Sequence, residues 1–289
     1  MADYIYPKVS ILDTVYNVAK IFKKKGAGEY SSSQGYTVTT GTNRVHFFTA
    51  IKSNNNVAVA RVMGEQNDNG DVGGTISKDR ELGHANDCAY YDSGFFIAQG
   101  GGDNDNTNIK RLNNSLEHVA TYKYKPTSSN NCNALTSVTG IAYISGGYFA
   151  LSQGMRVSIC KLDTDKGAFT EVSRFMLTGV GNHLSRGSSY ERLSQGIYYA
   201  HSKLYKAFSY KDSSGAIKQN DIGIFELNSS IPTEMSKAKF ETSYSCDKTE
   251  KALFEVEALS SPDAGNTMYM LANVYDGGEK DKLYRVSFS

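Results

Sequence analysis

The 289-residue sequence contains no tryptophan, four prolines and four cysteines. The cysteines are far apart and lack the close pairs that zinc sites and redox motifs need. We therefore expect reduced, buried thiols at Cys88, Cys132, Cys160 and Cys246. Scarce proline, together with 27 glycines, 20 tyrosines and 13 phenylalanines, favours many short strands joined by tight turns and little helix.

Neither sign of charge is in excess, because 31 basic residues balance 30 acidic ones and the isoelectric point is near 7.6. This balance excludes the dominant positive surface that nucleic-acid binders need. Long apolar runs are absent, and residues 1–8 show no basic region followed by an apolar stretch. The sequence thus predicts neither a membrane span nor an export signal. We expect a cytoplasmic protein, or a component of a phage-like particle that is released by lysis.

A pair of adjacent large residues recurs roughly every 50 residues, which is a spacing typical of repeat folds. Four copies are aromatic, and a fifth follows after a longer interval: Phe47-Phe48, Phe95-Phe96, Tyr148-Phe149, Tyr198-Tyr199 and Met268-Tyr269. We assign the longer interval to the polar segment 211–220, whose turn residues predict a hairpin insertion. The chain is therefore predicted to contain five structural units.

Alternation of apolar and polar residues predicts four antiparallel strands in each complete unit. The second, third and fourth units show them at 86–91, 95–99, 108–112 and 118–123; at 138–144, 147–152, 155–162 and 169–177; and at 188–193, 197–210, 221–227 and 239–245. The fifth unit has only 254–259, 267–273 and 282–288. We expect Asp3–Tyr6 to supply its missing edge strand and so to close a ring. Residues 11–26 have apolar residues at helical spacing and a terminal glycine, which predicts an amphipathic helix or cap.

This repeat number and strand count resemble the five-bladed β-propeller, an all-β fold shared by tachylectin-type lectins and by arabinanase- and invertase-type glycosidases. The resemblance covers nearly the whole chain and concerns architecture, because no catalytic signature of these families aligns with it. We expect one domain over residues 1–289, with a closing strand and helix in 1–28 and five blades in 29–289.

The resemblance implies that segments leading into the innermost strands lie on the ligand-binding face. Glu255 and Glu257 stand two apart on such a strand, so their side chains share a face. Two carboxylates in a confined channel raise the pKa of at least one, which prepares a general acid beside an ionised partner. A solvated pair at the rim, or a pair that holds a cation, is the alternative.

His84, Asn86 and Asp87 lead into the innermost strand of the second unit. An imidazole beside an amide and a carboxylate can orient a hydroxyl group and move a proton near neutral pH. Asn and Asp are also ordinary turn residues. We predict His84, Asp87, Glu255 and Glu257 as catalytic groups.

Further polar residues in the leading segments are predicted to bind substrate: Gln34, Asn86, Asn182, His183, Arg186, Ser188 and Tyr190. Arg186 has the planar fork that clamps a carboxylate or phosphate, although a bridge to Glu191 is equally compatible. The segment Gly100–Asn106 superficially resembles a calcium loop but lacks the required glycine and distal glutamate, so a flexible hairpin loop is the better interpretation. No metal ligand or cofactor is predicted, with a Ca²⁺ ion near the axis as the one option.

Two functions fit these residues. The leading segments all differ, which favours one central site over five equivalent sugar pockets, and we predict an enzyme with hydrolase, lyase or cyclase chemistry. The nucleophile-elbow, zinc-protease, P-loop and dinucleotide fingerprints are absent from the sequence. The alternative is a non-catalytic propeller that binds a glycan or receptor, as a lectin or the tip of a phage-like particle does. The expected partner is a small molecule, peptide or glycan, with no nucleic acid or membrane, and the chain is expected to be a monomer.

Overall fold

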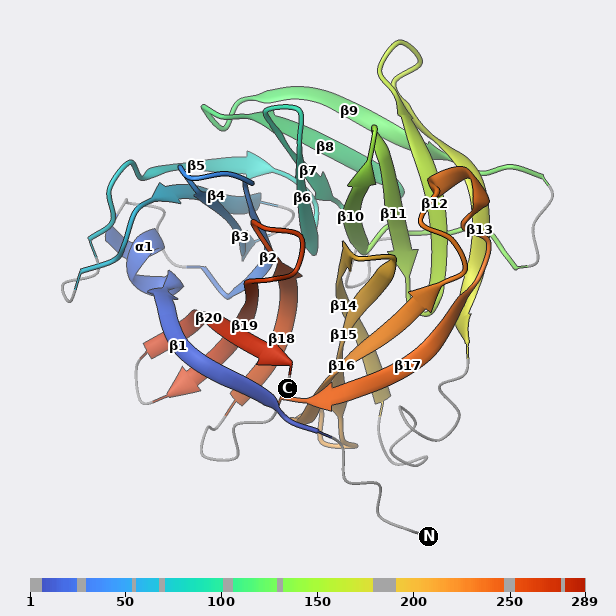
Figure 1. Ribbon diagram of the computed structural model, residues 1–289. Helices are drawn as coiled ribbons and strands as arrows, with labels where there is room; N and C mark the ends of the chain where they lie inside the picture. Colours follow the sequence, from blue (N-terminus) through green and yellow to red (C-terminus); the bar gives the residue numbers. More distant parts are fainter. Residues whose placement is uncertain are drawn as a thin grey trace, which may run out of the picture.

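The computed structural model describes residues 7–24, 30–53, 56–67, 71–100, 106–128, 132–178, 191–246, 253–276 and 279–288. Most of these residues lie in strands. Antiparallel pairing groups the strands in fours, which we call units, and the units are arranged around a centre (Figure 1). Two short parallel pairings join three units into one 12-stranded sheet, and the other two units are 4-stranded sheets. Among the described residues, no helix is long and apolar enough to cross a membrane. The described chain therefore has the all-β architecture of a β-propeller.

Units 1 to 4 follow the chain in order, and each begins with the strand nearest the centre. Unit 1 contains β2 (Ser32–Val38), β3 (Val45–Ser53), β4 (Asn56–Met63) and β5 (Ile76–Glu81). Unit 2 contains β6 (Asp87–Tyr91), β7 (Gly94–Ala98), β8 (Asn108–Asn113) and β9 (His118–Lys125). Unit 3 contains β10 (Gly140–Ser145), β11 (Tyr148–Gln153), β12 (Arg156–Asp163) and β13 (Ala168–Thr178). Unit 4 contains β14 (Glu191–Ala200), β15 (Lys203–Lys211), β16 (Ile217–Leu227) and β17 (Ala238–Ser245), with the short 3₁₀ helix Pro232–Glu234 between its last two strands.

Unit 5 combines the two ends of the described chain. Its strands are β18 (Leu253–Ser260), β19 (Met268–Asp276) and β20 (Glu279–Phe288), and β1 (Val9–Asn17) pairs antiparallel with β20 as the fourth strand. The predicted closing strand was thus placed too early in the sequence, and Asp3–Tyr6 lies outside the described residues. The helix predicted over 11–26 is also wrong in its first half, because α1 spans only Val18–Lys24. Two bulges in β1 interrupt its alternation, which explains why its apolar residues mimic helical spacing.

The five first strands form the inner ring. Each of β2, β6, β10, β14 and β18 lies against the first strands of the two neighbouring units, so the contacts run round a closed circle (Figure 1). A cluster of buried apolar side chains fills the space between every two neighbouring units, including units 5 and 1. The core is therefore divided among the unit interfaces, and we call the end of the ring where the first strands begin the N-terminal face.

Unit 4 differs from the sequence prediction in its first two strands. Tyr198 and Tyr199 belong to the first strand, β14, and not to the second, as the recurring pair had indicated. The turn that separates β14 from β15 is formed by His201 and Ser202, which both have positive φ values of 50° and 60°. Turns of this kind usually carry Asn or Gly, and neither residue type is present at His201 or Ser202, so the turn could not be predicted from residue types. The hairpin insertion predicted in 211–220 is confirmed, because Lys211 of β15 pairs with Ile217 of β16.

Candidate functional site

Glu255 and Glu257 lie on β18, the first strand of unit 5, with a bulge between Val256 and Ala258. The Glu255 side chain is half-buried, and its Oε1 accepts a hydrogen bond of 2.9 Å from Nε2 of Gln195 on β14. A carboxyl group of unit 5 is thereby held against the first strand of unit 4. This contact lies toward the N-terminal face of the ring.

The Glu257 side chain is only 2% exposed. Its Oε1 accepts a hydrogen bond from Nδ2 of Asn273 on β19, whereas its Oε2 has no hydrogen-bond partner among the described residues. Burial raises the pKa of the Glu257 carboxyl well above its usual value, and the negative charges of Glu255 and Asp281 raise it further against the opposing charge of Lys211. The surroundings of Glu257 therefore favour its protonated form more than those of an exposed glutamate do.

Glu255 is less buried than Glu257, and the pKa values of the two carboxyl groups are therefore affected differently. Burial raises the pKa of Glu255 as well, but the Lys211 charge and the hydrogen bond from Gln195 both act to lower it. Neighbouring carboxyl groups whose environments push their pKa values apart can serve as an acid and a base. In this pair the pKa is raised more for the more deeply buried Glu257 than for Glu255.

Asp87 has a different environment, because it is completely buried and its carboxylate accepts hydrogen bonds from three backbone amides. Its Oδ1 accepts a hydrogen bond from the N–H of Cys88 at 2.9 Å, and its Oδ2 accepts bonds from the N–H groups of Ile141 at 3.0 Å and Ile197 at 2.9 Å. One carboxylate thus joins the first strands of units 2, 3 and 4. We call this arrangement the Asp87 bracket.

The centre of the ring around the bracket is tightly packed. Lys206 is fully buried, and its Nζ donates to Oγ of Ser152 at 3.1 Å and to the carbonyl oxygen of Gln195. Burial raises the pKa of Asp87 to about 7 and lowers the pKa of Lys206 to about 8, and the attraction between the two charges opposes both shifts. A β-carbon at Gly196 would lie 2.9 Å from the carbonyl oxygen of Glu257 and 3.1 Å from Oδ1 of Asp87. Glycine is therefore required where β14 passes between β6 and β18.

The other described candidates lie in segments that lead into first strands. His84 is half-buried in the turn before β6, its backbone N–H donates to the Gln99 carbonyl at 3.0 Å, and burial lowers the pKa of its imidazole. Asn86 is buried, and its Nδ2 donates to the carbonyl oxygen of Thr139 at 2.8 Å. Gln34 is also buried and donates to Ser32 and Ser33 of its own strand. The side-chain amides of Asn86 and Gln34 thus have partners on or beside the first strands, whereas His84 is held through its backbone N–H.

Several predicted positions fall outside the described residues. They are Asn182, His183, Arg186, Ser188 and Tyr190, together with residues 101–105 of the loop that superficially resembles a calcium site. Within the described ranges, no group of three or more His, Cys, Asp or Glu side chains could hold a metal ion. All four cysteines have free thiols, and Cys132 is the half-buried one.

Sequence reasoning did not single out Gln195, Asn273 or Lys206. Asn273 is the cross-strand partner of Glu255 in the β18–β19 ladder, so finding it requires the register of a bulged pair. Lys206 occupies a central strand position, where an alternating pattern predicts an apolar or small residue. Gln195 stands on a first strand whose start was predicted too early. The one pattern that could have indicated these residues is a polar side chain at a strand position where a buried apolar residue is expected.

Comparisons with known proteins give only distant matches. No protein-family model matches the chain, and no curated protein matches its sequence. Among solved structures, an exo-β-1,3-galactanase from Phanerochaete chrysosporium is 8% identical, with a TM-score of 0.49 over 90% of this chain and 61% of that chain. The allergen Mala s 1 of Malassezia sympodialis is 12% identical, with a TM-score of 0.45 over 88% and 78%. An exo-1,5-α-L-arabinanase from a bovine ruminal metagenomic library is 9% identical, with a TM-score of 0.45 over 90% and 95%. At these scores the likeness does not extend to activity or substrate.

Proposed function

We propose that the five units are the blades of one five-bladed propeller domain, and that the chain is an enzyme with a single acid–base site at the N-terminal face of its axis. The closed circle of first strands and the five interface clusters support this blade count. The substrate class we propose is a glycan, with a peptide or another small molecule as the broader possibility. The reaction is hydrolysis or a lyase-type elimination, which both need one proton donor and one proton acceptor.

The observation that carries this proposal is the buried carboxyl group of Glu257 beside the less enclosed Glu255. Oε2 of Glu257 has no partner among the described residues, and the raised pKa of this carboxyl supports the role of proton donor. Glu257 would donate a proton to the leaving oxygen of the substrate. Glu255, positioned by Gln195, would act as base or nucleophile. Carboxyl pairs of glycosidases lie about 5–10 Å apart, which is the separation that this proposal requires of Glu255 and Glu257.

The other predicted residues take supporting parts in this proposal. Asp87 is a positioning residue, because its carboxylate holds the first strands of three units in place. His84 remains the predicted second proton-transfer group. Gln34, Asn86, Asn182, His183, Arg186, Ser188 and Tyr190 remain predicted substrate contacts. We further propose a monomeric, cytoplasmic protein.

The test is a panel of polysaccharides and 4-nitrophenyl glycosides incubated with wild type, Glu257→Gln and Glu255→Gln. Glu226→Gln, at an exposed position of β16, is the matched control. Loss of a general acid should lower the rate by about 10²–10⁴-fold, while circular dichroism shows an unchanged fold. Hydrolysis by Glu257→Gln at the wild-type rate would refute the proposed acid.

A non-catalytic glycan-binding propeller is the second candidate. The tight enclosure of Glu257 favours it, because a general acid must come within hydrogen-bond reach of its substrate. A glycan that binds wild type and Glu257→Gln equally well, without product formation, would establish this second function.

A further inference from the structure

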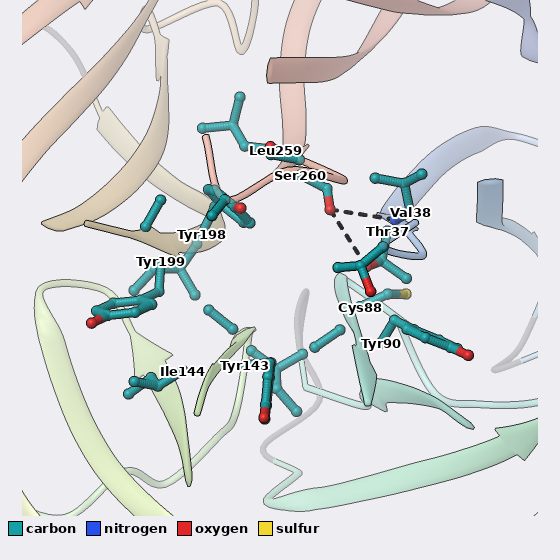
Figure 2. A pocket seen from close by; sticks show the side chains of 18 of the residues that line it. Thr37, Val38, Cys88, Tyr90, Tyr143, Ile144, Tyr198, Tyr199, Leu259 and Ser260 are labelled. Atoms are coloured by element: carbon teal, nitrogen blue, oxygen red, sulfur yellow. Dashed lines mark hydrogen bonds between the residues drawn. The ribbon is translucent and has the colours of Figure 1, made fainter. Parts of the chain in front are cut away.

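A pocket opens on the axis at the opposite end of the ring, where the first strands end. Its volume is about 230 Å³, and all five first strands contribute to its wall, together with the turns after β2, β14 and β18. In Figure 2 the labelled side chains surround this pocket, and those of Tyr90, Tyr143 and Tyr199 point away from its middle. The innermost part of the wall is thus made of strand edges and small side chains such as Ala89 and Ala142. We call it the C-terminal pocket.

The Asp87 bracket closes the bottom of this pocket. Cys88, Ile141 and Ile197 line it, and their backbone N–H groups are the three that Asp87 binds. Each of the three is the lining residue of its strand that lies nearest the N-terminal face. The pocket is therefore a blind funnel, and the bracket separates it from the Glu255–Glu257 pair.

Among the described residues, the wall of the pocket has no carboxylate, ammonium, guanidinium or amide side chain. It consists of apolar residues, Cys88, tyrosines, hydroxyl residues and His201 at the exposed mouth. The hydroxyl of Ser260 accepts a hydrogen bond of 3.3 Å from the Val38 N–H and lies 3.5 Å from Oγ1 of Thr37 (Figure 2). A charged ligand would lose its hydration here without gaining an ionic partner. A sugar would find few of the polar groups that fix its many hydroxyls.

From this geometry we propose that the C-terminal pocket binds a neutral ligand with a single aromatic ring and one hydroxyl-type substituent. An apolar cavity of about 150 Å³ holds benzene, so the larger volume here suits a ring with a short substituent. The ring would contact the apolar wall and the tyrosine edges, and its substituent would reach Ser260 and Thr37. This site is independent of the catalytic proposal, because it lies beyond the bracket.

The absence of tryptophan allows a direct test. Thr40 is exposed at the mouth of the pocket, and Thr40→Trp places a single fluorophore there. Val119, which is 51% exposed on β9 and does not line the pocket, gives the matched control Val119→Trp. Benzyl alcohol should change the emission of Thr40→Trp saturably and leave that of Val119→Trp unchanged. Benzoate, benzylammonium and methyl glucoside should bind at least about tenfold more weakly.

A second part of the experiment fills the C-terminal pocket with a larger side chain. Ala142→Leu in the Thr40→Trp background should abolish the response, whereas Ala120→Leu, on outer strand β9, should keep it. If Ala142→Leu fails to fold, the comparison of the four ligands with Thr40→Trp alone tests the proposed ligand class. Equal binding of the charged compounds, tighter binding of the sugar, or an identical response from Val119→Trp would overturn the proposal.

Discussion

At the scale of single residues, the unusual feature is the number of titratable groups buried near the axis. Burial raises the pKa of Glu257, Glu255 and Asp87 and lowers the pKa of Lys206. Each of these groups costs free energy to bury in its charged form. The Asp87 bracket offsets part of that cost with three backbone hydrogen bonds. The surroundings of Glu257, whose Oε2 has no partner among the described residues, instead favour the protonated form.

The raised pKa of Glu257 should make the free energy of unfolding depend on pH. A carboxyl group whose pKa is higher in the folded state binds a proton on folding, so the free energy of unfolding falls as pH rises from the unfolded pKa through the folded one. Glu257→Gln removes one such group. Between pH 4 and pH 7.5, wild type should lose roughly 1 kcal/mol or more relative to Glu257→Gln. The upper limit stays below the folded pKa of Lys206, about 8, where a contribution of opposite sign begins.

Urea unfolding at several pH values measures this difference, and Glu226→Gln should follow the wild-type curve. Parallel curves for wild type and Glu257→Gln would mean that Glu257 ionises normally.

The sequence predicted the carboxyl residues of the candidate site, but their environments could not be predicted from it. Glu255 and Glu257 were found because alternate residues of an inner strand share a face. Their partners Gln195 and Asn273 come from neighbouring strands, and only the observed register brings them together. For Asp87, residue type suggested chemistry, whereas its three backbone donors come from strands far apart in the sequence.

At the scale of elements, strands that alternate cleanly were predictable and strands with irregular ends were not. The four strands of unit 3 were predicted within three residues of their observed bounds because glycine-containing turns separate them. β1 was predicted as helix because two bulges break its period. β14 and β15 were divided at the wrong place because their turn is His201-Ser202. Local sequence signals therefore failed where an irregular backbone replaces the usual residue types.

The Asp87 bracket is a connection between elements, and removing it should weaken three of them together. Asparagine offers only one acceptor oxygen, so Asp87→Asn leaves at least one buried N–H without a partner. Each such group costs about 1–3 kcal/mol, and we expect a loss of about 2–4 kcal/mol in urea unfolding. Asp92→Asn, at an exposed turn where the carboxylate contacts Arg111, should cost less than about 1 kcal/mol. Equal effects of the two substitutions would argue against the bracket.

At the scale of the whole molecule, the two ends of the described chain meet in unit 5. β1 pairs with β20 and covers what would otherwise be an exposed edge. Pro7, which precedes β1, also contacts unit 4, because the Ser245 N–H at the end of β17 donates to the Pro7 carbonyl at 2.9 Å. The buried ring of Tyr16 packs against Phe48 of unit 1. The N-terminal strand thus links three units.

Deleting residues 1–17 should therefore lower the melting temperature by roughly 10 °C or more, because several kcal/mol of strand pairing and packing are lost. Differential scanning calorimetry measures the change. Deletion of residues 1–6 is the comparison, since it leaves β1 and Pro7 in place. The same melting temperature for both deletions would contradict closure by β1.

The central claim is that one carboxyl group at the axis stays protonated at neutral pH and can serve as an acid. Nuclear magnetic resonance of ¹³C-labelled glutamate carboxyl groups tests it directly, with Glu257→Gln and Glu255→Gln assigning the two signals. The account predicts that the Glu257 signal keeps the chemical shift of a neutral acid at pH 7, while the exposed glutamates have ionised. A Glu257 signal that titrates near its ordinary value of about 4.3 would contradict the claim and leave only the binding function.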